Sequence, residues 1–355
     1  MNKNIPYFRV ILLILALFKH NFGKITYINM VKNLIIIFSL ISFSLALIVG
    51  FSFSSNIIEN TKLISVKGGK KEISLTFTGD VILARSVNFL TVKNNDFTWS
   101  FKNIAEELRN SDLTIINLES PLIKNCPLTN EGFKFCGDER NVEGLVYSGI
   151  DVVGLANNHA GNYGKDGVEE TIKNLEKNNI SVSGANKRKI AYKEVEGVKI
   201  AFLSLNTIGY IEDSLVWGSE ENIKSLISEA KKNSDIVIVQ MHWGVEYVEE
   251  PTETQKKLGR LAIDSGADMV VGNHPHWIQK YEIYKDKYIL YALGNFIFDQ
   301  EWSKETKEGV IAKVRIRDMK ISDLEFVPIE IRNYGQVFKS DNNKILPKLM
   351  KGHSE

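Results

Sequence analysis

The sequence VVGNHPHW at residues 270–277 places two histidines, His274 and His276, directly after a short run of β-branched residues and a glycine. Side chains two positions apart on an extended backbone lie on the same side of a strand. A strand that ends in this turn can therefore aim both imidazoles at one point, as metal coordination requires. Such a pair is a weak indicator alone, and its meaning depends on the rest of the chain.

The chain has 355 residues, with 44 lysines and arginines against 43 aspartates and glutamates. This length suffices for one large domain or two modest ones with a full core. The balanced charge gives no reason to expect nucleic-acid binding, which needs a basic patch or a high pI. The composition is that of an ordinary globular protein, apart from its N-terminal part.

An uncharged apolar stretch lies near the N-terminus, at residues 34–53. It matches the roughly 20 residues that a helix needs to cross a bilayer. Lys24 and Lys32 precede it, and no base follows nearby until Lys62. By the positive-inside rule, the N-terminus stays in the cytoplasm and the bulk of the chain lies outside the cell membrane. We therefore predict a retained single-pass anchor with an extracytoplasmic domain, with a cleaved signal peptide as the alternative.

The rest of the chain can be divided into segments relative to this predicted anchor. Met30 is a natural start for it, so residues 1–29 are interpreted as an over-extended gene start. If the earlier apolar run at residues 10–18 also crossed the membrane, the domain would instead face the cytoplasm. Residues 54–71 predict a polar tether, residues 72–335 one catalytic domain, and residues 336–355 a frayed polar tail.

The only two cysteines, Cys126 and Cys136, lie close together in one predicted loop. Outside the membrane, a disulfide that closes this loop would be in keeping with the compartment. Two unpaired thiols are an equal alternative, because spacing alone does not establish disulfide geometry.

Between residues 73 and 293, apolar runs typical of strands alternate with amphipathic stretches typical of helices. Residues 310–317 and 321–331 then look like an antiparallel pair of strands. No repeat and no internal linker interrupts this pattern. It predicts an α/β domain built on a mixed sheet.

Polar residues follow the predicted strands directly, and four of the six histidines lie in these positions. The other two, His20 and His353, are near the termini. Loops at strand ends are where α/β folds place their chemistry, because the sheet holds them rigidly. Each residue alone has an ordinary role as a turn former, a cap or a core histidine, but together they predict a site. Its members are Asp80, Glu119, Asn158, His159, His242, His274 and His276.

Such a set supports two-metal hydrolysis. Carboxylates, an amide oxygen and imidazoles suit borderline divalent ions such as Mn²⁺, Fe²⁺ or Zn²⁺. Two ions about 3.5–4 Å apart can activate a shared water and stabilise the attacking and leaving oxygens. Asp80 or Glu119 can bridge them, and His159, next to a ligand but free itself, is the candidate general acid. The predicted ligands are Asp80, Glu119, Asn158, His242, His274 and His276.

These motifs, in this order, resemble the CapA family of poly-γ-glutamate capsule synthesis proteins. The resemblance covers about residues 73–299, and a single anchor ahead of an outward-facing domain also resembles the family. The matching stretches are TGDVILAR at 78–85, NLESPL at 117–122, LANNH at 155–159 with YG at 163–164, HWGVEY at 242–247, GNHPH at 272–276 and YALGNFIFD at 291–299.

The resemblance implies the calcineurin-like metallophosphatase fold, a four-layer α/β/β/α sandwich with a metal site at the sheet edge. It implies the same six metal ligands. Three positions depart from the pattern. General metallophosphatases carry a histidine where this chain has Ile82, which leaves the first metal one ligand short. The family often has histidine at Asn273, and aspartate at Asn162, where a carboxylate could tune His159.

Several further residues are candidates for binding substrate or supporting the ligands. Arg85 can neutralise an anionic substrate or make a salt bridge on a helix surface. Trp243 and Glu246, like Trp277, can shape the pocket, although core packing is the usual role of such aromatics. Asn295 can orient a ligand histidine, and Asn157 adjoins the ligand Asn158.

The leading hypothesis is a membrane-anchored, outward-facing CapA-type protein that acts in the synthesis, export or processing of poly-γ-glutamate or a similar anionic polymer. Membrane subunits of a capsule synthase are possible partners. One alternative is a phosphoesterase that acts on a phosphate ester of the cell envelope. Another is a non-catalytic subunit that binds metal or polymer, because a fold and a site do not fix the substrate.

Overall fold

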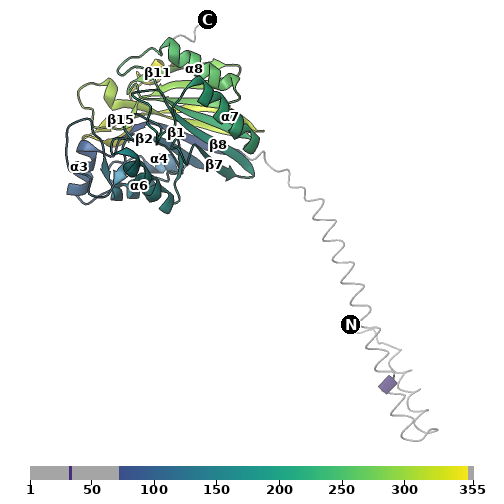
Figure 1. The fold of residues 1–355 in the computed structure, drawn as a ribbon, viewed down its shortest axis with the longest axis horizontal. Coiled ribbons are helices and arrows are strands. Elements are labelled where there is room, and N and C mark those ends of the chain that lie inside the picture. Colours follow the sequence, from purple (N-terminus) through teal and green to yellow (C-terminus); the bar gives the residue numbers. More distant parts are fainter. Residues whose placement is uncertain (1–31, 34–71, 351–355) are drawn as a thin grey trace, which may run out of the picture. The chain divides into compact units, whose positions relative to one another are not determined.

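Two β-sheets face each other in the part of the chain that the structure describes, and helices cover their outer sides (Figure 1). The structure is a computed structural model, and it describes residues 32–33 and 72–350. The larger sheet has eight strands. Seven run in the order β16-β15-β14-β1-β2-β5-β6, and β13 pairs with β1. Their bounds are β1 Ile73–Val81, β2 Leu113–Leu118, β5 Val152–Gly154, β6 Ser181–Ser183, β13 Asn295–Ile297, β14 Glu308–Arg317, β15 Lys320–Arg332 and β16 Gln336–Lys339.

The second sheet has six strands in the order β11-β12-β10-β9-β8-β7. Its central strands β8, β9, β10 and β12 are parallel, and an antiparallel strand closes each edge. Two short strands, β3 and β4, pair outside both large sheets. The bounds are β7 Ile190–Val195, β8 Val198–Asn206, β9 Ile236–His242, β10 Met269–Asn273, β11 Ile278–Tyr284, β12 Lys287–Leu293, β3 Leu122–Ile123 and β4 Gly137–Asp138.

Helices α3, α4, α5 and α6 share an apolar core with the outer face of the larger sheet, and α7 and α8 share one with the outer face of the second. Figure 1 shows α3, α4 and α6 on one side of the sheets and α7 and α8 on the other. The bounds are α3 Arg85–Lys93, α4 Ala105–Arg109, α5 Val142–Tyr147, α6 Gly164–Lys177, α7 Glu220–Asn233, α8 Glu253–Asp264 and α9 Leu346–Met350, with short 3₁₀ helices at Glu139–Asn141 and Glu305–Lys307.

Strand β9 explains why the sheets need cover on both faces. Ile236 and Ile238 pack into the core between the sheets, whereas Val237 and Val239 pack under α7 and α8. Alternate side chains of a strand point to opposite faces, so a continuous apolar run requires both faces to be buried. This arrangement confirms the predicted mixed α/β domain and gives the four layers helix, sheet, sheet and helix.

The structure differs from the predicted tail at residues 336–350. Strand β16 pairs with β15 at the edge of the larger sheet. Ile345 and Leu349 are buried in the core between the sheets, so the chain as far as α9 belongs to the domain. The sparse apolar residues of this segment are the ones that pack, which composition alone does not indicate.

The N-terminal predictions lie outside the described residues. They comprise the over-extended start at residues 1–29, the anchor at residues 34–53 and the tether at residues 54–71. Within residues 32–33 and 72–350, none of the helices combines the length and apolar character needed to span a bilayer.

Replacing Ile238 with alanine tests the core between the sheets. Ile238 is fully buried, and truncating a buried isoleucine to alanine typically costs about 2–5 kcal/mol of unfolding free energy. The matched control is Ile283→Ala in the same sheet, where the side chain is 55% exposed and the expected change is within about 0.5 kcal/mol. Denaturant unfolding measures both. Equal losses in the two variants would contradict the assignment of this core.

Candidate metal centre

The polar residues predicted from strand ends do meet at one edge, where the two sheets come together. Asp80 lies in β1 of the larger sheet, and His274 follows β10 of the second sheet. The backbone N–H of His274 donates to Asp80 Oδ2 at 3.0 Å. The carboxyl ends of parallel strands collect at one edge, which is why residues far apart in the sequence converge here.

One group of candidate ligands is completely buried. Asp80, Glu119 and His242 offer ligand atoms that all lie within 4.8 Å of one another. Asn158, after β5, adds an amide oxygen, because its Oδ1 lies 2.8 Å from Nε2 of His242. Carboxylate, amide and imidazole are thus brought together as predicted, and their roles as metal ligands belong to the proposal below.

A second group adjoins the first. Glu246, His274 and His276 also offer ligand atoms within 4.8 Å of one another. The ring centroids of His242 and His274 are 4.8 Å apart, which connects the two groups. Glu246, expected only to shape the pocket, therefore stands among the candidate ligands. Its carboxylate is a donor that can offset the histidine missing at Ile82.

The two histidines of the opening motif converge in a different way from the one predicted. Strand β10 ends at Asn273, and His274 and His276 have φ angles of 98° and 59°. Such backbone conformations are costly for residues other than glycine and persist where the surrounding structure enforces them. A tight turn, and not the alternation of an extended strand, therefore brings both imidazoles into the site.

Asn295 lies beside His276 in the way that the sequence suggested. Its Oδ1 is 2.9 Å from His276 Nδ1, while its Nδ2 donates to the carbonyl oxygen of Thr306 at 2.9 Å. The carbonyl accepts only, so this contact fixes the orientation of the amide. His276 Nδ1 therefore donates to Asn295, which leaves Nε2 of the ring free to bind a metal.

Unpartnered buried atoms test whether this site fits metal ions. Among the described residues, Glu119 Oε2, His274 Nδ1 and both polar side-chain atoms of Asn273 are buried without a hydrogen-bond partner. Buried polar atoms are normally satisfied, and each exception calls for a cause. A cation in each group, held in part by Glu119 in one and by His274 in the other, would be such a cause, so the donor set fits divalent metals.

The electrostatics of the protein without ions agree with this fit. Burial raises the pKa of the Glu119 carboxyl well above its usual range, and the Asp80 carboxylate raises it further. For Asp80, burial is opposed by the hydrogen bond and charge of His276, which hold its pKa below the ordinary value. Burial lowers the pKa of His242 well below the ordinary value and lowers that of His274 to about 3. Neutral imidazoles are the form that binds metal.

The candidate proton-transfer residue, His159, lies beside these groups. Burial lowers its pKa to about 4, although a hydrogen bond to Asn162 raises it. Nδ1 of His159 is 3.1 Å from Asn162 Oδ1. Asn162, where the family usually has aspartate, therefore still contacts the imidazole, but without a negative charge.

Two of the supporting residues, Arg85 and Trp243, are engaged by partners within the protein. Arg85 does not make a surface salt bridge, because its guanidinium is buried and pairs with the buried carboxylate of Asp299. Trp243 has the core-packing role that is usual for such an aromatic. It packs against Tyr291 in the core under α8, and its Nε1 donates to the backbone oxygen of Tyr291. Val237, Val239, Met241 and Trp243 share this core, so the alternation of side chains along the strand places Trp243 on the face opposite to His242.

Sequence reasoning overlooked Asn117, which ties the buried carboxylates together. Its Nδ2 lies 3.0 Å from Asp80 Oδ1 and 2.8 Å from Glu119 Oε1. Its Oδ1 accepts from Asn157, whose own Oδ1 accepts from the backbone N–H of His159. Asn157 therefore supports the loop that carries Asn158 and His159. A polar residue in an apolar strand, two positions before Glu119, was the available signal.

The sequence of this chain matches a known protein family and several of its members. The family described as "Bacterial capsule synthesis protein PGA_cap" matches residues 74–300. The chain belongs to this family. It is 30% identical over 309 residues to "Capsule biosynthesis protein CapA" of Bacillus anthracis, covering 80% of this chain and 74% of that one. It is 33% identical over 274 residues to "PGA biosynthesis protein CapA" of Bacillus subtilis (strain 168), covering 73% and 72%.

Solved structures confirm the fold. A novel phosphatase from Mycoplasma pneumoniae matches with a TM-score of 0.51 and 15% identity, over 74% of this chain and 94% of that one. A hypothetical protein from Thermus thermophilus matches with a TM-score of 0.50 and 16% identity, over 73% of this chain and all of that one. The CapA family and its calcineurin-like metallophosphatase fold, predicted from the motifs, are thus confirmed.

Replacing Asn117 with alanine tests its part in the site. The change leaves Glu119 Oε1 without its hydrogen bond in a buried setting, so metal-free protein should lose about 1–3 kcal/mol of unfolding free energy. The control is Asn233→Ala at the exposed end of α7, with an expected change within about 0.5 kcal/mol. Denaturant unfolding after chelation measures both. An unchanged midpoint in Asn117→Ala would show that the amide does not support the carboxylates.

Proposed function

We propose that this chain is a membrane-anchored, extracytoplasmic CapA-type protein with a metal-dependent hydrolase site. It acts in the synthesis, export or processing of poly-γ-glutamate or a similar anionic polymer. Membership of the capsule synthesis family and the names of the two Bacillus relatives support the polymer. The hydrolase site is inferred from this chain's own residues, since a shared fold does not fix an activity.

One observation supports the hydrolase site above all others. Two adjoining groups, each with a carboxylate and imidazole ligand atoms within 4.8 Å, meet at the edge shared by both sheets. Glu119 and His274, one from each group, each have a buried polar atom without a partner. An unpartnered buried polar atom costs free energy, and a bound cation would offset that cost at both residues.

The residues that would hold two divalent ions come from both sheets. In the buried group, Glu119 has one oxygen engaged by Asn117 and the other unpartnered, and this second oxygen would be available to a metal ion. In the second group, Glu246 supplies the further carboxylate. Bound ions of this kind polarise the bond to be cleaved and lower the pKa of the attacking water. The proposed ligands are Asp80, Glu119, Asn158, His242, Glu246, His274 and His276.

His159 is the proposed proton-transfer residue. With a pKa of about 4, its imidazole is neutral at pH 7 in the free protein. A neutral ring must gain a proton before it can act as a general acid. The negative charge of a bound polymer favours that protonation, because an opposite charge nearby stabilises the imidazolium. Arg85 is held by Asp299, so its charge is already paired and it is not a free anion-binding cation.

Two features support an extracytoplasmic location. Residues 34–53 are uncharged and long enough to form the proposed single-pass anchor. Cys126 and Cys136 are bonded as a disulfide, which resolves the alternative that the sequence left open. Disulfides persist in oxidising compartments outside the cytoplasm.

Metal content of the purified full-length chain tests the site. We expect about two equivalents of transition metal in the wild type, as in binuclear hydrolases, and a clear reduction in His274→Ala and Glu246→Gln. Glu250→Gln is the matched control, because Glu250 lies on the same loop but pairs with Lys280. Elemental analysis after incubation with Mn²⁺, Fe²⁺ or Zn²⁺ gives the result. Absence of bound metal in the wild type would overturn the hydrolase proposal.

Replacing His159 with alanine separates catalysis from binding. If His159 transfers a proton, hydrolysis of poly-γ-glutamate or of a phosphodiester should fall about 10²–10⁴-fold, with metal content unchanged in the same sample. Capsule output of cells that carry the variant provides the second measurement. Normal output and normal metal content would instead support a non-catalytic, polymer-binding subunit.

A further inference from the structure

The imidazole of His159 is held from one side by the loop that the disulfide closes, residues 126–136, here called the disulfide loop. We propose that Phe135 of this loop is a positioning residue for His159, and that the Cys126–Cys136 disulfide keeps Phe135 in place. This inference rests on the proposed role of His159. The disulfide loop would then help to form the site, in addition to stabilising the fold.

Two contacts join Phe135 to the imidazole. The rings of Phe135 and His159 are stacked, with centroids 4.0 Å apart and planes inclined by 21°. The backbone N–H of Phe135 donates to Asn162 Oδ1 at 2.7 Å, and the same oxygen lies 3.1 Å from His159 Nδ1. Phe135 therefore contacts the imidazole through its ring and contacts the hydrogen-bond partner of the imidazole through its backbone.

The shared oxygen determines which imidazole nitrogen carries the proton. A backbone N–H can only donate, so the Asn162 atom that faces Phe135 must be the oxygen. The same oxygen can then only accept from His159, which places a proton on Nδ1 of the imidazole. The ring stack fixes the plane of the imidazole, and Asn162 fixes its tautomer.

Besides the disulfide, the disulfide loop is contacted by Arg85, whose Nη1 donates to the carbonyl oxygen of Gly132 at 3.3 Å, and its Lys134 lies over the ring of Tyr163. No helix or strand lies within residues 124–136, and most of the loop side chains are exposed. Phe135 and Cys136 are buried, at 2% and 5% exposure, whereas Phe133 is 81% exposed. The end of the loop that carries Phe135 is therefore anchored, and its middle lies in solvent.

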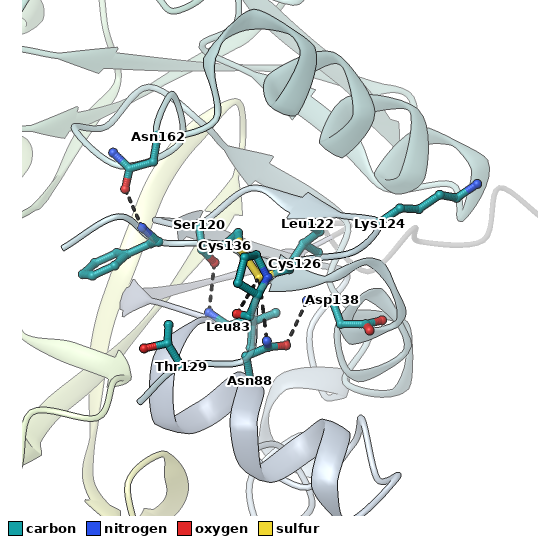
Figure 2. The surroundings of a disulfide bond; sticks show 12 residues. Leu83, Asn88, Ser120, Leu122, Lys124, Cys126, Thr129, Cys136, Asp138 and Asn162 are labelled. Atoms are coloured by element: carbon teal, nitrogen blue, oxygen red, sulfur yellow. Dashed lines mark hydrogen bonds between the residues drawn. A yellow bond between two sulfur atoms is a disulfide. The ribbon is translucent and has the colours of Figure 1, made fainter. Parts of the chain in front are cut away.

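The anchor is built from the motifs that supply the metal ligands. Figure 2 shows the disulfide beside Asn88 of α3, whose Oδ1 accepts from the backbone of Asp138. Leu122 of β3 pairs with Gly137 of β4, next to Cys136. A side chain at Gly137 would meet the backbone oxygen of Leu83 at 2.1 Å, so only glycine allows this approach. The disulfide to Cys126 thus holds Phe135 next to α3, β3 and β4, whose positions are fixed by these contacts.

The Phe135 ring is also contacted by side chains other than His159, and these contacts restrict its position. The guanidinium of Arg85 lies 4.6 Å from the ring centroid, and Phe298 meets the ring edge-on at 6.4 Å. Arg85 is itself fixed by Asp299. The ring is thus held by fixed neighbours while its face contacts the imidazole. Loss of the ring would free His159 to rotate, and small misplacements of a catalytic group are costly.

The test compares Phe135→Leu with Phe133→Leu in the full-length chain, together with the double variant Cys126→Ser/Cys136→Ser. NMR of the protein with isotope-labelled histidines reports the ring-current shift that the stacked phenyl ring imposes on the carbon-bound protons of His159. We expect this shift to disappear in Phe135→Leu and to be reduced in the double variant. It should persist in Phe133→Leu and in Phe135→Tyr, which retains a ring.

Turnover provides the second measurement. Phe135→Leu should lower kcat up to about 100-fold with little change in KM or metal content, and Phe135→Tyr should restore most of it. Reductant should lower the wild-type rate and leave the double variant unaffected. A persisting NMR shift in Phe135→Leu, or an unchanged kcat in a folded Phe135→Leu protein that hydrolyses substrate as wild type, would overturn the proposal.

The two measurements also separate this inference from the proposed function. The NMR comparison is made without substrate and does not depend on turnover. If the wild type hydrolyses no substrate but the shift behaves as expected, the proposed activity fails while the positioning of His159 by Phe135 stands. If the wild type is active and the shift is absent, the positioning role alone fails.

Discussion

The contact on which the site depends is the hydrogen bond from the backbone N–H of His274 to the carboxylate of Asp80. It joins the ends of two strands from different sheets, β1 and β10, at 3.0 Å. Because an ionised carboxylate accepts it in a buried setting, the bond is stronger than one between neutral groups. Asn117 and His276 are further hydrogen-bond partners of the same carboxylate. The bond from His274 sets the distance between the two groups of candidate ligands. Asn117 and Asn295 then hold the remaining side chains around that fixed pair.

Forming the site costs free energy, because polar groups are buried and backbone conformations are strained there, and the surrounding apolar core must offset this cost. Glu119, His242 and His274 are buried, and two of the ligand-bearing residues adopt positive φ angles. The core between the sheets and the two outer cores supply the compensating apolar burial. This division explains why the polar residues lie at strand ends. There the backbone is rigid, yet the apolar layers are not interrupted.

Most of the fold and the main site residues could be predicted from the sequence. The features that could not be predicted were missed for physical reasons. Alternation of apolar runs and helical stretches indicates the mixed sheets, and polar residues after strands such as Asp80 and His242 indicate the site because strand ends converge. The contribution of Phe135 could not be predicted, since its contact with His159 depends on the path of an irregular loop. The positive φ angle at His274 was not predicted, because a tight turn brings His274 and His276 together just as an extended strand was expected to do. Arg85 was misplaced because its partner Asp299 is 214 residues away.

The origin of the ligands from both sheets bears on how the protein matures. Asp80 and His274 are separated by 194 residues, so the two groups of candidate ligands meet only when both sheets have formed. If these residues bind metal as proposed, the complete site exists only when the second sheet has docked on the first, and binding would then add to the stability of the folded state alone. If the chain crosses the membrane unfolded, as its proposed location implies, its ions come from the medium on the far side. The external supply of metal, and not the cytoplasmic one, would then decide what the protein carries.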